Sequence, residues 1–154
     1  MSAAPASQIA SFHLDAPLAQ VLPLFTAEGE RVWAPGWDPE ILSGQGERGS
    51  VFRTRGHDGI ETTWIVTEFS PSQGRASYAR LKEGSNMGLV DVVCSTPAGG
   101  GTDVSVRYTV TGTSPEGIRF VDEFLRPDSY RAMIEEWHTA TAAAVATHKG
   151  RGQG

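Results

Sequence analysis

TDVSVRYTVTGTSPEGIRF, residues 102–120, contains the point at which the chain changes from one spacing of apolar residues to another. In its first part every second residue is apolar, as in a strand with one buried face: Val104, Val106, Tyr108 and Val110. Ser114, Pro115 and Glu116 then combine a capping hydroxyl, a proline at the first helical position and an acidic first turn. The segment predicts a strand that leads directly into a helix.

The region before this segment repeats the two-residue spacing. Turn-rich pieces such as GHDG, SPSQG, EGSN and PAGGG divide it. We therefore predict an antiparallel meander of strands at residues 51–56, 61–70, 74–84, 86–98 and 102–114.

Ahead of the meander, the pattern of residues 8–14 predicts a strand that ends at Asp15. Two short helices should follow it. The first has helical spacing of apolar residues but contains Pro23, which should kink or shorten it. The second has Thr26 as its cap, and Pro35 ends it.

The C-terminal part predicts a helix from residue 115 to about His148, in which Phe120 and Phe124 share a face and Pro127 permits a kink. Its apolar stripe continues through Tyr130, Ile134, Trp137, Thr141 and Ala144. A sheet cannot leave its apolar face in water, and only this helix is long enough to cover it. The expected fold is α+β: an antiparallel six- to seven-stranded sheet wrapped around a long C-terminal helix, with two short helices after the first strand.

Composition narrows the function classes. The 154 residues suit one domain, for which we expect residues 8–148, with residues 1–7 and 149–154 as flexible tails. No apolar run approaches the ~20 residues of a membrane span, and the opening MSAAPASQ does not look like a signal peptide. A net charge of −5 with scattered basic residues argues against nucleic acid as a partner. One cysteine, Cys94, cannot form an internal disulfide, so we expect a cytoplasmic protein.

Four segments carry a resemblance to a known family: GERVWAPGWDPEIL (29–42), VFRT (51–54), TTWIVTEFSP (62–71) and YRAMIEEW (130–137). They resemble the START and Bet v 1-like (SRPBCC) superfamily, and most of all its small bacterial helix-grip proteins of the polyketide cyclase/dehydrase-like and Hsp90-activator-like group. The resemblance covers residues 8–148. It implies a deep cavity between the sheet and the long helix, which the superfamily uses for lipids, sterols, polyketides and other apolar molecules.

WAPGWDPE, residues 33–40, places two tryptophans four positions apart in a segment whose prolines prevent regular structure. We expect both indoles to turn inward near the mouth of the cavity, where they either gate it or seal the core. The alternation of the strands also turns Val66, Val90, Val92 and Val106 inward. The candidate ligand-binding residues are Trp33, Trp37, Phe52, Trp64, Tyr78, Tyr108, Phe124, Tyr130, Ile134 and Trp137.

Polar candidates for the same cavity are Thr54, Glu61 and Arg80, and no catalytic residue is assigned. GQGERG (44–49) matches the GxGxxG pattern, but a strand follows it where a dinucleotide site needs a helix. Glu135 and His138 have the spacing of a di-iron pair but lack the second helix that such a site requires. We therefore expect no cofactor and no metal.

Three functions remain open. The preferred one is binding of a small, mostly apolar molecule, for which a cavity above ~300 Å³ is typical. The second is a polyketide cyclase/dehydrase-type enzyme, marked by a buried acid or base with a strongly shifted pKa. The third is a protein-interaction domain resembling the Hsp90 activator, with a filled core and an exposed apolar patch. The sequence leaves the oligomeric state open, and edge strands make a homodimer possible.

Overall fold

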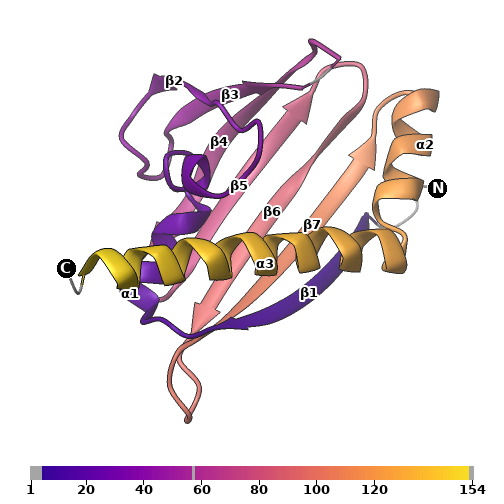
Figure 1. The fold of residues 1–154 in the computed structure, drawn as a ribbon. Helices are drawn as coiled ribbons and strands as arrows, with labels where there is room; N and C mark the ends of the chain where they lie inside the picture. Colours follow the sequence, from indigo (N-terminus) through magenta and orange to yellow (C-terminus); the bar gives the residue numbers. More distant parts are fainter. Residues whose placement is uncertain (1–4, 57, 153–154) are drawn as a thin grey trace.

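The computed structural model describes residues 5–56 and 58–152. Its seven strands form one antiparallel sheet in the order β1-β7-β6-β5-β4-β3-β2 (Figure 1). The strands are β1 (Ala6–Leu14), β2 (Glu40–Ser43), β3 (Val51–Arg55), β4 (Glu61–Ser70), β5 (Arg75–Lys82), β6 (Asn86–Ser95) and β7 (Thr102–Gly112). The predicted meander is confirmed, with β1 added at its edge beside β7.

Two features of the sheet differ from the sequence analysis. The strand β2 was not among the predicted strands, because it is short and exposed and its register with β3 shifts between Ile41 and Ser43. The first strand begins two residues early, so Ala6 and Ser7 pair with β7 and do not belong to a tail. The rest of the predicted N-terminal tail, up to residue 4, lies outside the described residues, as do residues 153–154.

The segment after β1 forms three short helical turns. The first two, α1 (Leu18–Val21) and the 3-10 turn η1 (Leu22–Phe25), follow each other directly, and Pro23 lies at the start of η1. The third, η2 (Gly29–Val32), follows Thr26. The Thr26 hydroxyl accepts a hydrogen bond from the Gly29 N–H at 3.0 Å and donates one to the Pro23 carbonyl at 2.7 Å. These turns occupy one end of the sheet.

The C-terminal region contains two helices, α2 (Pro115–Phe124) and α3 (Pro127–Gly152), where one kinked helix was expected. The Ser114 hydroxyl caps α2 by accepting from the Gly117 N–H at 3.0 Å, as the sequence predicts. Pro127 fits the first turn of a helix, where its missing N–H leaves no bond unmade, so it starts a new helix and does not bend the old one. The helix α3 also continues to Gly152, beyond the predicted end near residue 148.

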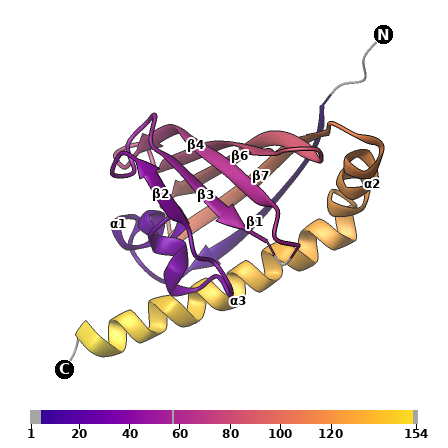
Figure 2. The same cartoon turned by 90° about the horizontal axis from the view of Figure 1, so that it is seen from above.

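The longer helix covers the concave face of the sheet, as Figure 2 shows from above. The residues of its predicted stripe are buried or half-buried: Tyr130, Ile134, Trp137, Thr141 and Ala144. The Tyr130 hydroxyl donates to the Val106 carbonyl at 2.7 Å and joins the helix to the middle of β7. The sheet and this helix therefore enclose the core.

The two faces of the sheet differ as the alternation predicts. Val104, Val106, Tyr108 and Val110 of β7 are all buried in the core. The opposite, convex face is partly apolar, since Ile65, Leu81, Met87 and Leu89 are exposed there. Cys94 is buried and free, and burial raises its thiol pKa to about 12.

Candidate functional site

A cavity of about 140 Å³ lies between the concave face of the sheet, the η2 turn and α3. We call it the aromatic cavity. Seven of the ten candidate residues line it: Trp33, Trp37, Phe52, Trp64, Tyr78, Tyr108 and Trp137. Its other lining residues are Phe25, Glu30, Ala34, Val90 and Val92. Aromatic side chains from segments far apart in the sequence therefore converge on one small space.

Three candidates, Phe124, Tyr130 and Ile134, do not line this cavity. Two of them, Phe124 and Tyr130, contact the Tyr108 ring, which does line the cavity. These are edge contacts, at centroid distances of 5.2 and 6.0 Å. Phe124 and Tyr130 therefore pack against a residue of the cavity wall and are not part of the wall themselves.

The lid segment, residues 33–40, turns both of its indoles inward. Trp33 is buried, and its Nε1 donates to the Leu24 carbonyl at 2.6 Å. Trp37 is half-buried, and its Nε1 donates to the Ala27 carbonyl at 2.8 Å. Each indole N–H thus binds a main-chain carbonyl, one in η1 and one in the turn between η1 and η2, which fixes the position of the ring over the cavity.

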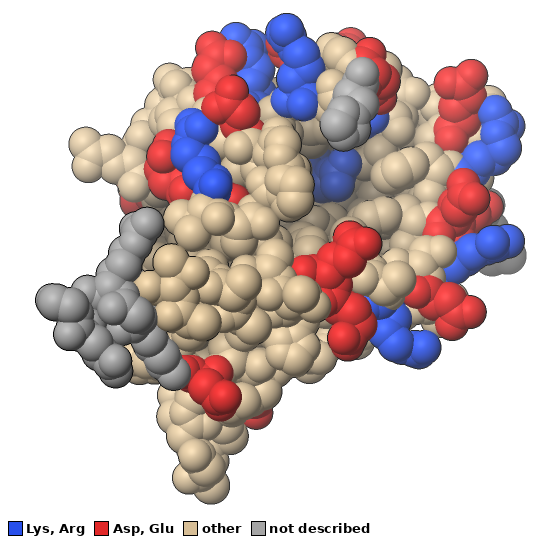
Figure 3. All heavy atoms as spheres, viewed as in Figure 1, with Lys and Arg blue, Asp and Glu red and all other residues tan. Residues whose placement is uncertain are grey.

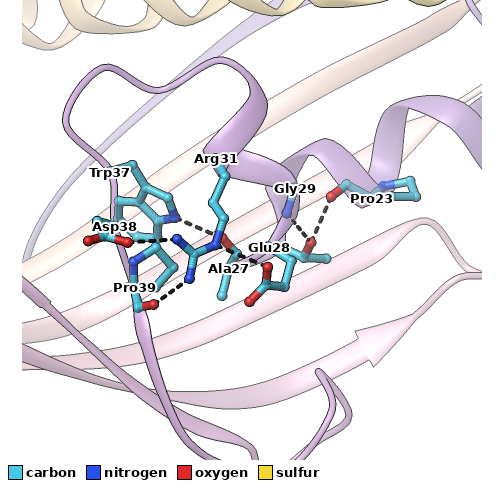
Figure 4. Close-up of polar contacts among 9 residues, drawn as sticks. Pro23, Ala27, Glu28, Gly29, Arg31, Trp37, Asp38 and Pro39 are labelled. Carbon is cyan, nitrogen blue, oxygen red and sulfur yellow. Dashed lines mark hydrogen bonds and ion pairs between the residues drawn. The ribbon is translucent and has the colours of Figure 1, made fainter.

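A single arginine holds the lid segment to the η2 turn (Figure 4). The Arg31 guanidinium donates from Nε to Glu28 at 3.0 Å and from Nη1 to Asp38 at 2.7 Å, and from Nη2 to the Pro39 carbonyl. Its rigid fork makes all three contacts at once, a geometry that lysine does not share. We call this group of contacts the Arg31 clamp.

Arg31→Ala is expected to loosen the lid segment without unfolding the protein. The clamp is exposed, so its loss should change the free energy of global unfolding only slightly. Amide hydrogen exchange in residues 33–40 should accelerate about tenfold, because local opening no longer breaks these contacts. Hydrogen exchange with mass spectrometry measures this, with Arg131→Ala as control, since its pair with Asp128 is exposed at 3.7 Å. Equal acceleration along the whole chain would contradict a local clamp.

Most polar groups around the cavity are bound to protein. Besides the two lid indoles, Trp64 Nε1 donates to the Thr54 hydroxyl at 3.0 Å, and the Tyr78 hydroxyl donates to the Phe25 carbonyl at 2.6 Å. Within the described residues, the Glu30 carboxyl and the Tyr108 hydroxyl make no hydrogen bond. These two groups are therefore free to contact a ligand.

Glu30 is the acidic residue of the cavity. It lies in η2, one turn before Trp33, and is half-buried. Because its carboxyl lies among apolar side chains, desolvation raises its pKa from 4.5 to about 8. Desolvation also raises the pKa of Tyr78 and of Tyr108, so both phenols stay neutral. At neutral pH the carboxyl is mainly protonated and can donate a hydrogen bond.

The two charged candidates lie elsewhere. Arg80 is half-buried on β5, with its guanidinium 5.2 Å from the centre of the Trp64 ring, and its Nε has no hydrogen-bond partner within the described residues. Burial lowers the pKa of this guanidinium. Glu61 forms ion pairs with Arg53 and Arg55, at 3.6 and 2.7 Å, and does not enter the cavity. Figure 3 shows a Lys or Arg side chain recessed in a hollow on the face that carries α3.

A second cavity, of about 340 Å³, lies beside the first. It extends from Thr26, Ala27 and Glu28 to the β2–β3 loop, which contains the glycines of GQGERG. Phe52 and Tyr78 line both cavities and form their common wall. The loop therefore borders a hollow next to the aromatic cavity.

Three residues that line the aromatic cavity were not among the sequence-based candidates: Phe25, Glu30 and Ala34. A signal for Glu30 exists, because residues three positions apart lie on the same side of a helical turn. If Trp33 turns inward, Glu30 turns inward with it. Val90 and Val92 follow from the alternation of their strand, as expected.

Among residues 5–56 and 58–152, no three His, Cys, Asp or Glu side chains lie close enough to hold a metal ion. None of the helices in the described part of the chain has an apolar stretch long enough to cross a membrane.

Comparison with known proteins extends these findings. A family model described as polyketide cyclase / dehydrase and lipid transport matches residues 8–150. No curated protein sequence matches the chain significantly.

Several solved structures are similar to the whole fold. An uncharacterized protein from Rhizobium leguminosarum is 23% identical, with a TM-score of 0.55, over 77% of this chain and 87% of that one. Ara h 8.0201 is 15% identical, with a TM-score of 0.65, over 94% and 97%. Major latex-like protein 151 from Panax ginseng is 12% identical, with a TM-score of 0.65, over 90% and 95%. These likenesses establish a Bet v 1-like, helix-grip fold.

Proposed function

Because the chain belongs to the family of polyketide cyclases, dehydrases and lipid-transport proteins, we propose that it binds a small, mostly apolar molecule in the aromatic cavity. The observation that carries the proposal is the composition of the wall, which contains four tryptophans, two tyrosines and two phenylalanines. Rigid aromatic walls with few polar groups are typical of small-molecule sites. The free thiol of Cys94 agrees with action in the cytoplasm.

The size of the cavity limits the ligand. Its volume of about 140 Å³ is below the ~300 Å³ at which drug-sized sites begin. The ligand is therefore small, or one end of it occupies the aromatic cavity while the rest extends past Phe52 and Tyr78 into the second cavity. The Glu30 carboxyl and the Tyr108 hydroxyl would orient its polar group.

Purification without added ligand tests the proposal. A native mass spectrum should show an additional small mass that disappears on denaturation, and that mass identifies the ligand. All four tryptophans line the cavity, so adding the ligand back should change the intrinsic fluorescence. Val90→Phe, which fills the cavity, should abolish binding. Leu89→Phe, on the exposed face of the same strand, should leave it unchanged. Equal binding by both variants would place the ligand elsewhere.

One observation favours a second function, a polyketide cyclase/dehydrase-type enzyme. Glu30 has the strongly raised pKa that such a reaction requires of a general acid or base. In Glu30→Gln a substrate would still enter but would not react. The copurified molecule would then differ in mass between wild type and variant, and identical masses would favour binding alone.

The interaction-domain alternative keeps some support, because the aromatic cavity of about 140 Å³ is smaller than the ~300 Å³ expected for binding. The exposed apolar side chains of the convex face, Ile65, Leu81, Met87 and Leu89, are the feature that it requires. The aromatic cavity and its unpaired acid are features that it does not require. We therefore place the function inside the fold and not on its outer surface.

A further inference from the structure

The Glu30 carboxyl lies in an apolar cavity without a counter-charge. No lysine, arginine or histidine of the described residues forms an ion pair with it. A carboxylate in such surroundings is unstable unless a positive group accompanies it. The protein does not supply that group, so the carboxyl of the empty cavity is mainly protonated at neutral pH, and a positively charged ligand would provide the counter-charge that the ionised form lacks.

The walls of the cavity suit a positive ligand. Three of the four indole N–H groups bind protein oxygens and are not available to a ligand, and one of these three rings, that of Trp64, already contacts Phe52 and the Arg80 guanidinium. The rings stand at steep angles to each other, 64° between Trp33 and Trp137 and 70° between Trp37 and Trp64. Rings arranged in this way surround a small space on several sides. Aromatic faces attract cations, and tryptophan does so most strongly.

From this geometry we propose that the aromatic cavity selects an organic cation, a small alkylammonium group, with the Glu30 carboxylate as its counter-charge. The inference rests on the proposed function, because it names the ligand class of the same cavity. A neutral apolar ligand would leave the carboxyl without a partner. An anion would find the wall's N–H and phenol donors already bound, apart from the Tyr108 hydroxyl and the Trp137 N–H. A volume of about 140 Å³ suits a head group the size of trimethylammonium.

Of the charged and titratable groups around Glu30, two are tyrosines of the wall and one is an arginine outside the cavity. Tyr78 faces Glu30 from β5 and Tyr108 from β7, and both are neutral phenols. Arg80, also on β5, does not line the cavity, but its guanidinium packs against the Trp64 ring and interacts electrostatically with Tyr108, so a positive group of the protein lies next to the wall. Each lining residue contributed by β3, β4, β6 and α3 is uncharged.

Binding of a cation should depend on pH. In the empty protein the carboxyl has a pKa of about 8, so only a minor fraction is ionised at pH 6 or 7. A cation binds the ionised form and displaces the proton. Its affinity should therefore rise about tenfold for each pH unit below 8 and level off above it.

The experiment compares choline with its neutral carbon isostere, 3,3-dimethyl-1-butanol, by isothermal titration calorimetry at pH 6.5 and 8.5. We expect choline to bind at least tenfold more tightly at pH 8.5. At pH 6.5 its binding should release a proton, seen as a heat that varies with the ionisation enthalpy of the buffer. Glu30→Gln should lose most of the preference for choline and all of its pH dependence, while the rings keep a small preference for the cation. Glu135→Gln, exposed on α3, should behave as wild type.

Trp37→Leu provides a second measurement that does not rely on changing the acid. It keeps an apolar side chain at this position but removes the ring, so it should weaken choline more than the isostere. Equal affinities of the two probes in the wild type would overturn the cation assignment and leave apolar binding in place. Failure of choline to bind would also overturn the cation assignment. The proposed function would then still be tested separately, by the copurified ligand and by the Val90→Phe variant.

Discussion

Glu30→Gln is expected to remove a pH dependence of stability that the wild type shows between about pH 4.5 and pH 8. The folded protein holds the carboxyl proton up to a pKa of about 8, whereas the unfolded chain releases it near 4.5. Between these values the folded state binds more protons. Stability is therefore full below 4.5 and falls as pH rises, by at most about 1.4 kcal/mol per pH unit and roughly 5 kcal/mol in total.

Urea denaturation at half-unit pH steps measures this loss. The difference between wild type and Glu30→Gln isolates the contribution of Glu30. This is needed because a hydrogen bond to Asp103 raises the pKa of His13 above 6.5. Deprotonation of His13 therefore also lowers stability as pH rises, but at higher pH. Acids whose pKa is lowered, such as Asp58 beside Lys82, act only at lower pH and in the opposite sense. Glu135→Gln is the matched control. Parallel curves for wild type and Glu30→Gln would show that the carboxyl is hydrated in the folded state.

Trp33→Ala should be the most destabilising single change in the lid segment, with a loss of about 3 to 5 kcal/mol. Its ring is buried against Trp137 and Phe25, at centroid distances of 5.3 and 5.8 Å, and its removal leaves a void and an unpaired Leu24 carbonyl. Trp37→Ala should reduce stability less, because Trp37 is half-buried. Urea denaturation of the two variants gives the comparison.

Ligand affinity separates the two roles considered for the lid tryptophans. If Trp37 gates the cavity, Trp37→Ala weakens ligand binding while most of the stability remains. If it only seals the core, the melting temperature falls and the affinity of the remaining protein is unchanged. Similar losses of stability in the two variants would contradict the different burial of Trp33 and Trp37.

The fold could be predicted because its main elements have strong local patterns. The alternation of β7 and the capped start of α2 stand side by side in the sequence, and both are confirmed. The strand β2 has no such pattern, since its residues are exposed and it pairs only with β3. The break before Pro127 was missed because the same proline permits either a kink or a new helix.

The candidate site could be predicted only in part. Alternation identifies which strand residues face inward, and so it found Phe52, Trp64, Tyr78 and Tyr108. Alternation does not show which inward side chains pack against each other and leave no cavity between them, as Phe124 and Tyr130 do. Glu30 was missed because an acid in a short polar turn normally faces water, and only its distance from Trp33 along the turn places it inside.

In the sequence β1 is the first strand of the sheet and its partner β7 is the last, so β1 leaves the ribosome long before β7 does. Ala6 lies opposite Val110 and Leu14 opposite Thr102, so the first strand to emerge waits for the last. Until β7 is synthesised, the backbone amides of β1 lack their partners in the sheet, and an unpaired strand can associate with other chains. Translation speed through residues 15–101 therefore sets how long this strand is exposed, and slow codons in that stretch would lengthen the exposure.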